Sequence, residues 1–276
     1  MQNKTALITG ATSGLGKATA IQLADLGVNL ILACRNLNKA EQVKKLIQQR
    51  STVNVNLVYV DLAILQTVRE AATEIIKNFT VPDIIINNAG VFNLSRQETV
   101  DGLEHTMAVN YYSHFLLTYL LLPSLKIANK PIRIINVSSK AALHSSISLK
   151  NINFQKRYHS FKAYGASKLA QLYFTRELAQ QLINSNITVN AVHPGSVSTN
   201  IWHLKTNLVA NVIKKFSKTP EEGAKPIIYV ATSSEVEKIS GKFYGNKKII
   251  NYTAKSSNKK TQQDLWNYSL KTVMGV

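Results

Sequence analysis

Residues 5–16 read TALITGATSGLG, a short apolar run followed by a turn with glycine at positions 10, 14 and 16. Residues 17–26 continue with apolar side chains at helical spacing, so the segment predicts a strand, a glycine turn and a helix. This order is typical of the start of a dinucleotide-binding fold. Small residues let the backbone approach a pyrophosphate, and the N–H groups at the helix start attract its negative charge. The glycine spacing differs from G-x-G-x-x-G, so the prediction depends on the flanking strand and helix.

The rest of the chain alternates between apolar runs and segments with helical spacing. Further strands are expected at 28–34, 53–60, 83–86, 132–137, 187–192 and 241–245. Helices are expected at 38–49, 65–79, 102–122, 160–182, from 220 onward and at 264–273. Near-continuous apolar strands indicate a parallel sheet that is buried on both faces. We therefore predict one α/β domain over residues 1–276, a Rossmann-type doubly wound parallel sheet of about seven strands flanked by helices.

Composition indicates a globular chain in a reducing compartment. Hydrophobic residues make up 45% of the 276 residues, which supports a full-sized core. No apolar run reaches the roughly 18 residues of a membrane-spanning helix, and residues 1–4 leave no room for a signal peptide before the first strand. Cys34 is the single cysteine, so no internal disulfide can form. We expect a soluble, cytoplasmic protein with no signal peptide or membrane anchor.

The charge balance is strongly basic, with 33 Lys and Arg against 15 Asp and Glu, for a net charge of +18. Residues 238–263 contain seven lysines and no acidic residue. Such a window fits a solvated surface, an anionic partner or peripheral contact with a membrane. No nucleic-acid-binding motif accompanies it, so no nucleic-acid partner is expected. No metal site is expected either.

The end of the second strand bears on the choice of nucleotide. Arg35 lies nineteen residues after Gly16, and no acidic residue precedes it in the strand. An acidic residue about 20 positions beyond the glycines bonds the ribose 2′-hydroxyl of NAD, whereas an arginine there suits the 2′-phosphate of NADP. NADP(H) is therefore favoured over NAD(H).

Two further strand ends carry candidate nucleotide contacts, because open α/β sheets bind ligands outside the carboxyl ends of their strands. Asp61 and Leu62 follow the third strand. Asp61 can bond the adenine amino group or act as the N-cap of the next helix, and both readings stay open. Asn88, Ala89 and Gly90 follow the fourth strand and form a small-residue loop suited to close approach by a ligand.

Tyr164 and Lys168 stand four residues apart in the helix expected at 160–182, and therefore on one helical face. A cation held within about 4 to 6 Å favours the phenolate and lowers the tyrosine pKa from its usual value of about 10. The pair would then serve as a general acid/base, although this spacing also arises by chance on solvated faces. Asn110 lies in mid-helix, where asparagine is unfavourable, so it indicates either a contact near the site or a solvent-facing position.

In the same order and over essentially the whole chain, these motifs resemble the classical short-chain dehydrogenase/reductase family. The resemblance rests on TGATSGLG at 9–16, NNAG at 87–90, Asn110, Ser139, YGASK at 164–168, and Pro194-Gly195. Segments 33–36, 60–63, 136–139 and 192–195 look most like the branch of retinol dehydrogenases and WW-domain oxidoreductases, as does the 25-residue gap between Ser139 and Tyr164. Ser113 replaces a glycine usual in that branch and Tyr111-Tyr112 replace a His-Leu pair, which bears on substrate shape and not on chemistry.

The resemblance implies an oxidoreductase that uses NADP(H) to interconvert an alcohol and an aldehyde or ketone. The substrate would be a small-to-medium apolar carbonyl, similar to a retinoid, steroid or lipid. Tyr164 would exchange a proton with the substrate oxygen, and Ser139 would donate a hydrogen bond to that oxygen. Lys168 would lower the pKa of Tyr164 and bond the nicotinamide ribose. Asn110 would hold a water that links Lys168 to solvent.

The same resemblance implies the residues that hold the nucleotide. They are Gly10, Thr12, Ser13, Gly14, Leu15, Gly16, Arg35, Asp61, Leu62, Asn88, Ala89, Gly90, Tyr164, Lys168, Pro194, Gly195 and Thr199. Residues 201–222 would form a substrate lid, or else a small helix packed on the body of the protein. His193 is expected to be structural. Members of the family commonly form dimers or tetramers, so a homo-oligomer is one option.

Two other functions remain open. A regulatory or scaffold protein would bind NADP(H) with little turnover and use its basic surface for an anionic partner, but the set Asn110, Ser139, Tyr164 and Lys168 argues against it. A light-driven protochlorophyllide reductase shares the Cys-Arg strand end and the Asp-Leu-Ala segment. The segment 91–100 is short for the usual insert of that enzyme. The physiological substrate and the direction of the reaction are not indicated by the sequence.

Overall fold

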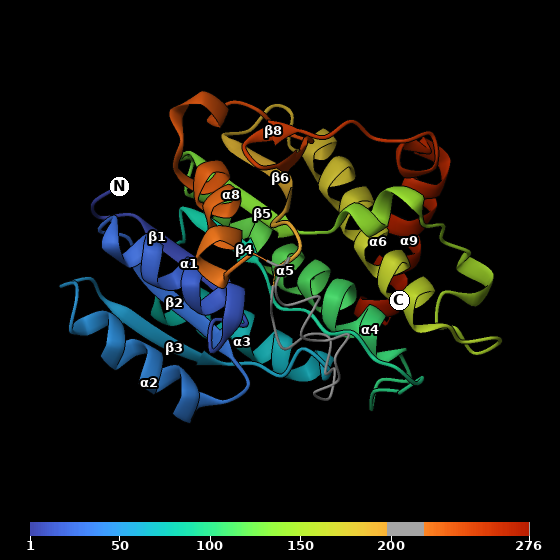
Figure 1. The fold of residues 1–276 in the computed structure, drawn as a ribbon, viewed down its shortest axis with the longest axis horizontal. Helices are drawn as coiled ribbons and strands as arrows, with labels where there is room; N and C mark the ends of the chain where they lie inside the picture. The colour runs from blue at the N-terminus through green and yellow to red at the C-terminus, as the bar shows by residue number, and fades with distance from the viewer. Residues whose placement is uncertain (198–217, 276) are drawn as a thin grey trace.

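One sheet organises the described residues, 1–197 and 218–275, in the computed structural model (Figure 1). Its strands are β1 (Thr5–Thr9), β2 (Asn29–Cys34), β3 (Val55–Tyr59), β4 (Ile84–Asn87), β5 (Ile132–Val137), β6 (Ile187–His193), β7 (Phe243–Gly245) and β8 (Lys248–Ile249). Across the sheet they lie in the order β3-β2-β1-β4-β5-β6-β7-β8, and all pairs are parallel except β7 with β8. The predicted Rossmann-type doubly wound fold is confirmed.

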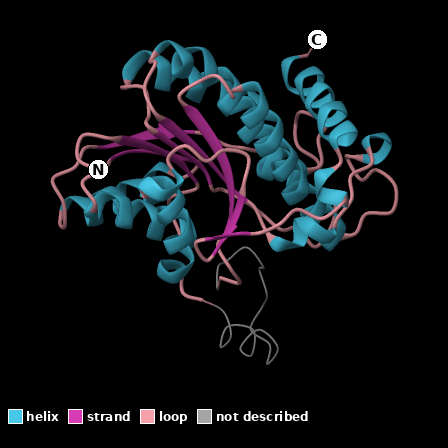
Figure 2. Cartoon of the chain, turned by 90° about the horizontal axis from the view of Figure 1, so that it is seen from above, coloured by secondary structure: helices cyan, strands magenta, loops and turns pink. Residues whose placement is uncertain are grey.

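Helices cover both faces of this sheet, as the view from above shows (Figure 2). On one face lie α1 (Gly14–Asp25), α2 (Leu37–Gln48) and α8 (Pro220–Thr232). On the other lie α3 (Leu65–Asn78), α5 (Ser113–Ile127), α6 (Ser160–Gln181) and α9 (Lys259–Met274). The apolar strands therefore pack against helices on both sides, as near-continuous apolar runs predict. In the described part of the chain, no helix combines the length and the hydropathy needed to span a bilayer.

The sheet has eight strands where the sequence predicted about seven. The extra strand is β8, which pairs antiparallel with β7 through a turn at Asn246 and Lys247. Both turn residues have positive φ, +48° and +64°, as a type I′ hairpin turn requires. Glycine is the usual residue at the second of these positions, and here it is lysine, so the sequence carries a weak hairpin signal.

The helix expected at 102–122 is not continuous. Gly102 has φ +72°, and the Glu104 carboxylate caps a short helix α4 (His105–Met107) by accepting from the N–H groups of Thr106 and Met107. A π-helical turn, η1 (Ala108–Tyr112), then leads into α5. Such turns are rare, and they occur often at functional sites. Asn110 lies inside this one.

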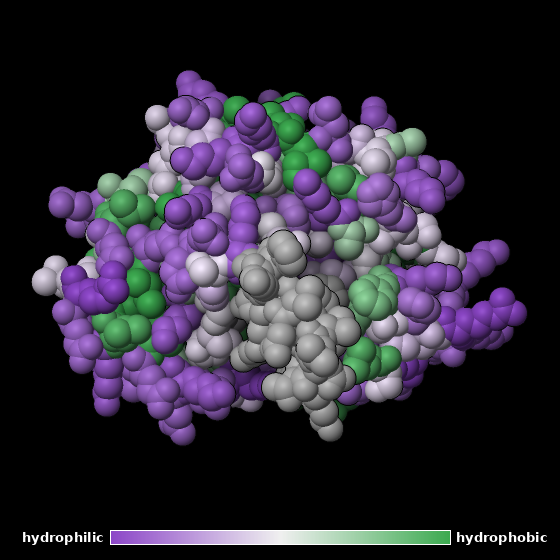
Figure 3. Space-filling model, viewed as in Figure 1, coloured by the Kyte–Doolittle hydropathy of each residue, from purple (hydrophilic) through white to green (hydrophobic). Residues whose placement is uncertain are grey.

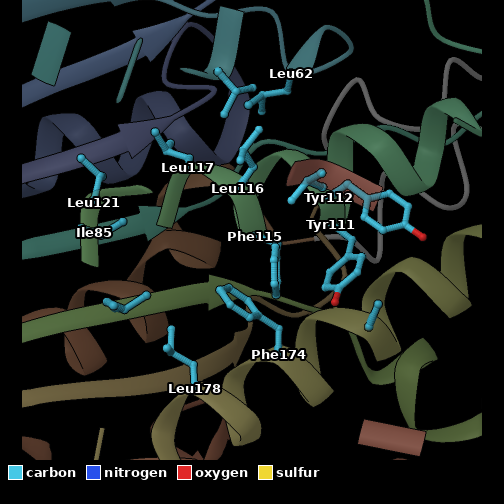
Figure 4. Packing of buried hydrophobic residues seen from close by; sticks show 14 of the residues in the cluster. Leu62, Ile85, Tyr111, Tyr112, Phe115, Leu116, Leu117, Leu121, Phe174 and Leu178 are labelled. Atoms are coloured by element: carbon cyan, nitrogen blue, oxygen red, sulfur yellow. The ribbon is translucent and has the colours of Figure 1, made fainter. Parts of the chain in front are cut away.

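Tyr111, Tyr112 and Ser113 are core residues, so any effect on substrate shape would be through packing and not through direct contact. Figure 4 shows the two tyrosines beside Phe115 among the buried hydrophobic side chains, and Tyr112 has no exposed surface. The Tyr111 hydroxyl lies 2.8 Å from Ser269 Oγ on α9. Ser113 Oγ donates to the Leu62 carbonyl at 2.5 Å and fastens the loop after β3 to α5. These departures from the family pattern therefore lie in the packing around the start of α5.

The lysines of the window 238–263 are all exposed: Lys238, Lys242, Lys247, Lys248, Lys255, Lys259 and Lys260. The face seen in Figure 3 is mainly hydrophilic, with hydrophobic side chains in small groups. Lys260 forms an ion pair with Asp264 on the same helix, and Lys247 lies over the Tyr229 ring. Exposure of all seven lysines fits each of the three readings of this window, so its role stays a prediction.

Candidate active site

The candidate site lies at the carboxyl edge of the sheet, between β1 and β4. Strand order reverses there, since β2 lies on one side of β1 and β4 on the other, and this point is where open α/β sheets bind nucleotides. The glycine turn after β1 meets the loop after β4, because a Cβ added to Gly10 would lie 2.9 Å from Ala89. A Cβ on Gly90 would lie 3.5 Å from Lys168 Nζ. The fold therefore brings the predicted nucleotide and catalytic segments together.

The glycine turn has the geometry of a phosphate cradle. Gly10 and Gly14 have φ of +69° and +50°, which disfavours any other residue. A Cβ on Gly16 would lie 2.3 Å from the Gly10 carbonyl oxygen and 2.5 Å from Asn88 Nδ2, so the helix starts in close contact with both loops. Ser13 precedes α1 and makes no side-chain cap bond to its N–H groups. The start of α1 thus fits the negative charge of a dinucleotide pyrophosphate.

Other turn residues differ in exposure. Thr12 is half-buried, Ser13 is exposed, and the Leu15 side chain is 9% exposed among the core residues under α1. Leu15 therefore offers its backbone, and not its side chain, to a nucleotide.

Arg35 and Asp61 form an ion pair at the ends of β2 and β3, with Arg35 Nη1 3.7 Å from Asp61 Oδ2. The Arg35 side chain is 70% exposed, so its guanidinium has most of its donors facing solvent. Asp61 Oδ1 accepts from the Ala63 N–H at 3.0 Å, in a local turn. Asp61 does not cap α3. The N–H of Leu65, the first residue of α3, donates to Asp101 Oδ2 at 2.9 Å instead.

Asn87, the last residue of β4, and Asn88, the next residue, have different surroundings. Asn88 Nδ2 donates to the Thr9 carbonyl at 2.8 Å, and the N–H groups of Asn88 and Ala89 donate to Thr9 Oγ1 at 3.0 and 3.1 Å. Among the described residues, Asn87 Oδ1 and Asn88 Oδ1 are both buried without a hydrogen-bond partner, so this feature does not distinguish the two. Asn87 instead donates to Thr118 and Asn136 in the core. Leu62 also packs into the core, with its side chain 7% exposed.

Asn110 joins the loop after β4 to α6. Its Oδ1 accepts from the Val91 N–H at 2.7 Å, and its Nδ2 donates to the Val91 carbonyl at 3.0 Å and to Ser167 Oγ at 2.9 Å. Ser167 Oγ in turn donates to the Tyr164 carbonyl at 2.7 Å. Asn110 is fully buried, so the solvent-facing reading of this residue is wrong and the contact near the site is confirmed.

Tyr164, Lys168 and Ser139 lie together, as the sequence predicted. Lys168 Nζ lies 5.8 Å from the centre of the Tyr164 ring, and Ser139 from the end of β5 hydrogen-bonds the Tyr164 hydroxyl. The expected lowering of the tyrosine pKa is not found. Burial raises the pKa of Tyr164 to about 12, and the bond from Ser139 offsets only part of this. Burial also lowers the pKa of Lys168 to about 7, so that its charge is weakened near neutral pH.

An aromatic wall stands beside Tyr164. The Phe92 ring lies 5.6 Å from the Tyr164 ring and 5.1 Å from the Phe161 ring. Phe161 is 61% exposed on the first turn of α6. It also lines a cavity of about 360 Å³ together with Ser145, Ile147 and Phe154, which come from the long segment between Ser139 and Tyr164. Phe92 therefore places an apolar ring directly beside Tyr164, and Phe161 extends this aromatic surface.

Comparisons with known proteins agree with this geometry. The sequence pattern of the family described as short chain dehydrogenase matches residues 4–208. The chain belongs to the short-chain dehydrogenase family. It is 40% identical to retinol dehydrogenase 14 of Mus musculus, over 98% of this chain and 85% of that protein, and 39% identical to retinol dehydrogenase 13 of Homo sapiens, over 98% and 84%. A solved structure from Mycobacterium paratuberculosis matches with a TM-score of 0.80 and 30% identity, over 99% of this chain and 94% of that one.

Family membership makes this protein an oxidoreductase whose fold binds a nicotinamide cofactor. The similarity to retinol dehydrogenases inferred from its motifs is confirmed. A role in the interconversion of alcohols and carbonyls follows from these relatives.

His114 is a residue of the site of this short-chain dehydrogenase that the sequence analysis missed. It is buried, with Nε2 2.8 Å from Thr9 Oγ1 and Nδ1 3.2 Å from the Asn110 carbonyl oxygen. Burial lowers the pKa of His114 to about 4, so the ring is neutral near neutral pH. A carbonyl only accepts, so Nδ1 carries the proton and Nε2 accepts from the Thr9 hydroxyl. Its position four residues after Asn110, on the same helical face, was the available signal.

The segment after β6 closes the edge of the dehydrogenase site. Pro194 and Gly195 are half-buried, and Gly195 has φ +95°, which turns the chain after β6. Burial, with the charges of Lys140 and Lys218, lowers the pKa of His193 to about 4. The Thr199 prediction and residues 201–217 of the expected lid lie outside the described residues. Residues 220–222 of the expected lid form the start of α8.

Proposed function

We propose that this short-chain dehydrogenase uses NADP(H) to interconvert an alcohol and an aldehyde or ketone. The observation that carries the proposal is the meeting of Tyr164, Ser139 and Lys168 beside the glycine turn and the loop after β4. A proton-exchanging hydroxyl, a hydrogen-bond donor and a cation are the groups needed at an oxygen that gains and loses charge.

A bound nicotinamide would supply or accept the hydride, and the chain supplies the rest. The glycine turn, the start of α1 and residues 88–90 hold the nucleotide. Tyr164 transfers its hydroxyl proton to the substrate oxygen in reduction and takes it back in oxidation. Ser139 bonds the Tyr164 hydroxyl in the structure without substrate. With a substrate bound, its single O–H would turn to donate to the substrate oxygen and stabilise the charge that develops there. Lys168 provides positive charge within 5.8 Å of the Tyr164 ring.

The preference for NADP(H) is supported by Arg35. Its guanidinium is exposed at the end of β2, the position at which an arginine accommodates a ribose 2′-phosphate. Asp61 is the nearby acid, and its ion pair with Arg35 occupies the carboxylate that would otherwise suit a 2′-hydroxyl.

A small-to-medium apolar substrate is supported by the aromatic wall and by the relatives. Phe92 and Phe161 give the space beside Tyr164 an apolar side. Several of the most similar curated proteins are named retinol dehydrogenases, which favours a retinoid-, steroid- or lipid-like carbonyl. The cytoplasmic location, the substrate lid, peripheral membrane contact and a homo-oligomer stay predictions.

One observation favours a second candidate function, an NADP(H)-binding regulatory protein with weak turnover. Burial raises the pKa of Tyr164 and lowers the pKa of Lys168, and both shifts oppose formation of the phenolate.

A substrate panel separates the two functions. Retinoid, steroid and alkyl carbonyls and alcohols are incubated with each of the four nicotinamide forms, and reduced nicotinamide is followed by absorbance. Turnover with an apolar carbonyl and NADPH, faster than with NADH, supports the dehydrogenase. Tight NADPH binding by calorimetry without turnover of any panel member supports the regulatory protein.

A further inference from the structure

The side chain of Gln171 connects two groups of the proposed active site. Gln171 lies three residues after Lys168 on α6 and is 1% exposed. Its Oε1 accepts from Lys168 Nζ at 3.2 Å, and its Nε2 donates to the Asn110 carbonyl at 2.7 Å. One amide therefore spans the distance between the lysine ammonium and the carbonyl of the π-helical turn.

The Asn110 carbonyl has no acceptor position left for a water. It accepts from Gln171 Nε2 at 2.7 Å and from His114 Nδ1 at 3.2 Å, and a carbonyl oxygen offers two lone pairs. Thr9 fixes the His114 ring through Nε2, so the second donor is held in place as well. The water that Asn110 was expected to hold for Lys168 therefore finds both acceptor positions of this carbonyl used by protein donors.

We propose that Gln171 is a positioning residue that replaces this bridging water and holds the Lys168 ammonium beside Tyr164. The inference rests on the proposed function of the site. An amide keeps both of its N–H protons and passes none from the ammonium to the carbonyl. Lys168 in this chain therefore acts through its charge, and the Asn110 carbonyl takes no part in proton return.

The stability of the Lys168 ammonium depends on Gln171, because few other groups around it can stabilise a positive charge. Lys168 Nζ donates to the Val137 carbonyl on β5 at 2.9 Å and to Gln171, both neutral. The titratable groups that face it are Tyr164 on α6 and His114 on α5. Among the described residues no carboxylate is paired with it. The charge of Lys168 is thus stabilised by two neutral oxygens, and Gln171 supplies one of them.

Titration of Lys168 in the full chain tests this directly. Lysine carrying ¹³C at Cε is incorporated, and the Lys168 resonance is assigned by its loss in Lys168→Arg. Gln171→Leu removes the acceptor and should lower the Lys168 pKa by about one unit, while Gln171→Glu places a carboxylate there and should raise it by at least as much. Gln171→Ala leaves room for a water that bonds both groups, so its shift should be smaller than that of Gln171→Leu.

Gln262→Leu is the matched control, because Gln262 is a buried glutamine whose Nε2 donates to Glu177 away from the site. It should leave the Lys168 titration unchanged. Opposite shifts in the Leu and Glu variants support the proposal, and the pH profile of kcat should move in the same directions. If Gln171→Leu does not fold, the Lys168 pKa in Gln171→Glu and Gln171→Ala tests the proposal. Folded variants with an unmoved Lys168 pKa overturn the inference, whereas an absence of turnover in the unaltered protein overturns only the proposed function.

Discussion

The Lys168 ammonium lies 5.8 Å from the centre of the Tyr164 ring and donates to the Val137 carbonyl at 2.9 Å. The pair is adjacent, as the i, i+4 spacing predicts, but the ammonium forms its hydrogen bonds with β5 and with Gln171. Tyr164 is bonded by Ser139 instead. The end of β5 thus holds both groups of α6, since Ser139 bonds the Tyr164 hydroxyl and Val137 bonds the Lys168 ammonium.

Loss of the Tyr164 hydroxyl should abolish most turnover and leave nucleotide binding intact. A general acid/base is typically worth 10² to 10⁴-fold, so Tyr164→Phe should lower kcat by at least about 10²-fold. Steady-state kinetics give kcat, and fluorescence titration gives the NADPH Kd. Tyr158→Phe is the matched control, because that hydroxyl donates to the Asn93 carbonyl at 2.9 Å, and its kcat should stay close to that of the unaltered protein. Unaltered turnover in Tyr164→Phe would remove Tyr164 from the mechanism.

Arg35 should set the choice between the two nucleotides. Arg35→Asp replaces a phosphate donor by a carboxylate, and should weaken NADPH binding by about 10 to 10²-fold, the range of a hydrogen bond to a charged group, and NADH binding far less. Calorimetry gives the Kd of NADPH and of NADH for each variant, and so the ratio of the two. Arg50→Gln removes another exposed arginine, paired with Asp25 at 2.9 Å, and should leave both affinities unchanged. Equal losses for NADPH and NADH in Arg35→Asp would mean that Arg35 does not contact the 2′-phosphate.

Gly16 should tolerate no side chain. Its added Cβ would lie 2.3 Å from the backbone oxygen of Gly10, and backbone cannot move aside as a flexible side chain can. Gly16→Ala should lower the free energy of unfolding by about 1 to 3 kcal/mol, as overpacking does. It should also weaken NADPH binding. In Gly90→Ala the added Cβ meets Asn110 Oδ1 at 3.4 Å and Lys168 Nζ at 3.5 Å, both ordinary contacts, so its stability should fall less. Denaturant unfolding gives the free energy of unfolding of both variants. Equal losses in Gly16→Ala and Gly90→Ala would contradict the prediction.

The sequence predicted the strands and the residues at their ends because both depend on local patterns. Apolar runs mark the buried strands, and the carboxyl ends of parallel strands converge at one edge. The π-helical turn around Asn110 was missed because its residues have ordinary helical spacing in sequence. β8 was missed because two residues carry no periodicity.

Contacts across the fold were also beyond the sequence. Gln171 reaches the Asn110 carbonyl, and His114 reaches Thr9, only once α5, α6 and β1 have packed together. The predicted direction of the Tyr164 pKa shift was wrong for the same reason. Spacing along a helix predicts a neighbouring charge, whereas desolvation depends on everything that packs around the pair.

Burial of Lys168 should make stability depend on pH in a defined window. Its pKa is about 7 in the folded protein against 10.5 for an ordinary lysine. Below pH 7 the ammonium is charged in both states, and its burial opposes folding in full. Between these two pKa values the unfolded chain binds more protons, so the free energy of unfolding rises with pH, by at most about 1.4 kcal/mol per unit.

Lys168→Met lacks this proton, so its stability advantage over the unaltered protein should be largest near neutral pH and shrink toward about pH 10, the ordinary tyrosine value. Above that value Tyr164, whose pKa is raised, contributes a fall in stability with pH. Its ring lies beside Lys168, so this contribution differs between the two proteins and the comparison ends there. Cys34, whose burial raises its pKa to about 11, is shared by both proteins and cancels in the difference. Urea unfolding at several pH values measures this difference in the free energy of unfolding between the two proteins. Lys260→Met removes a lysine that is 85% exposed and should show a constant difference. A constant difference for Lys168→Met as well would mean that Lys168 keeps an ordinary pKa in the folded protein.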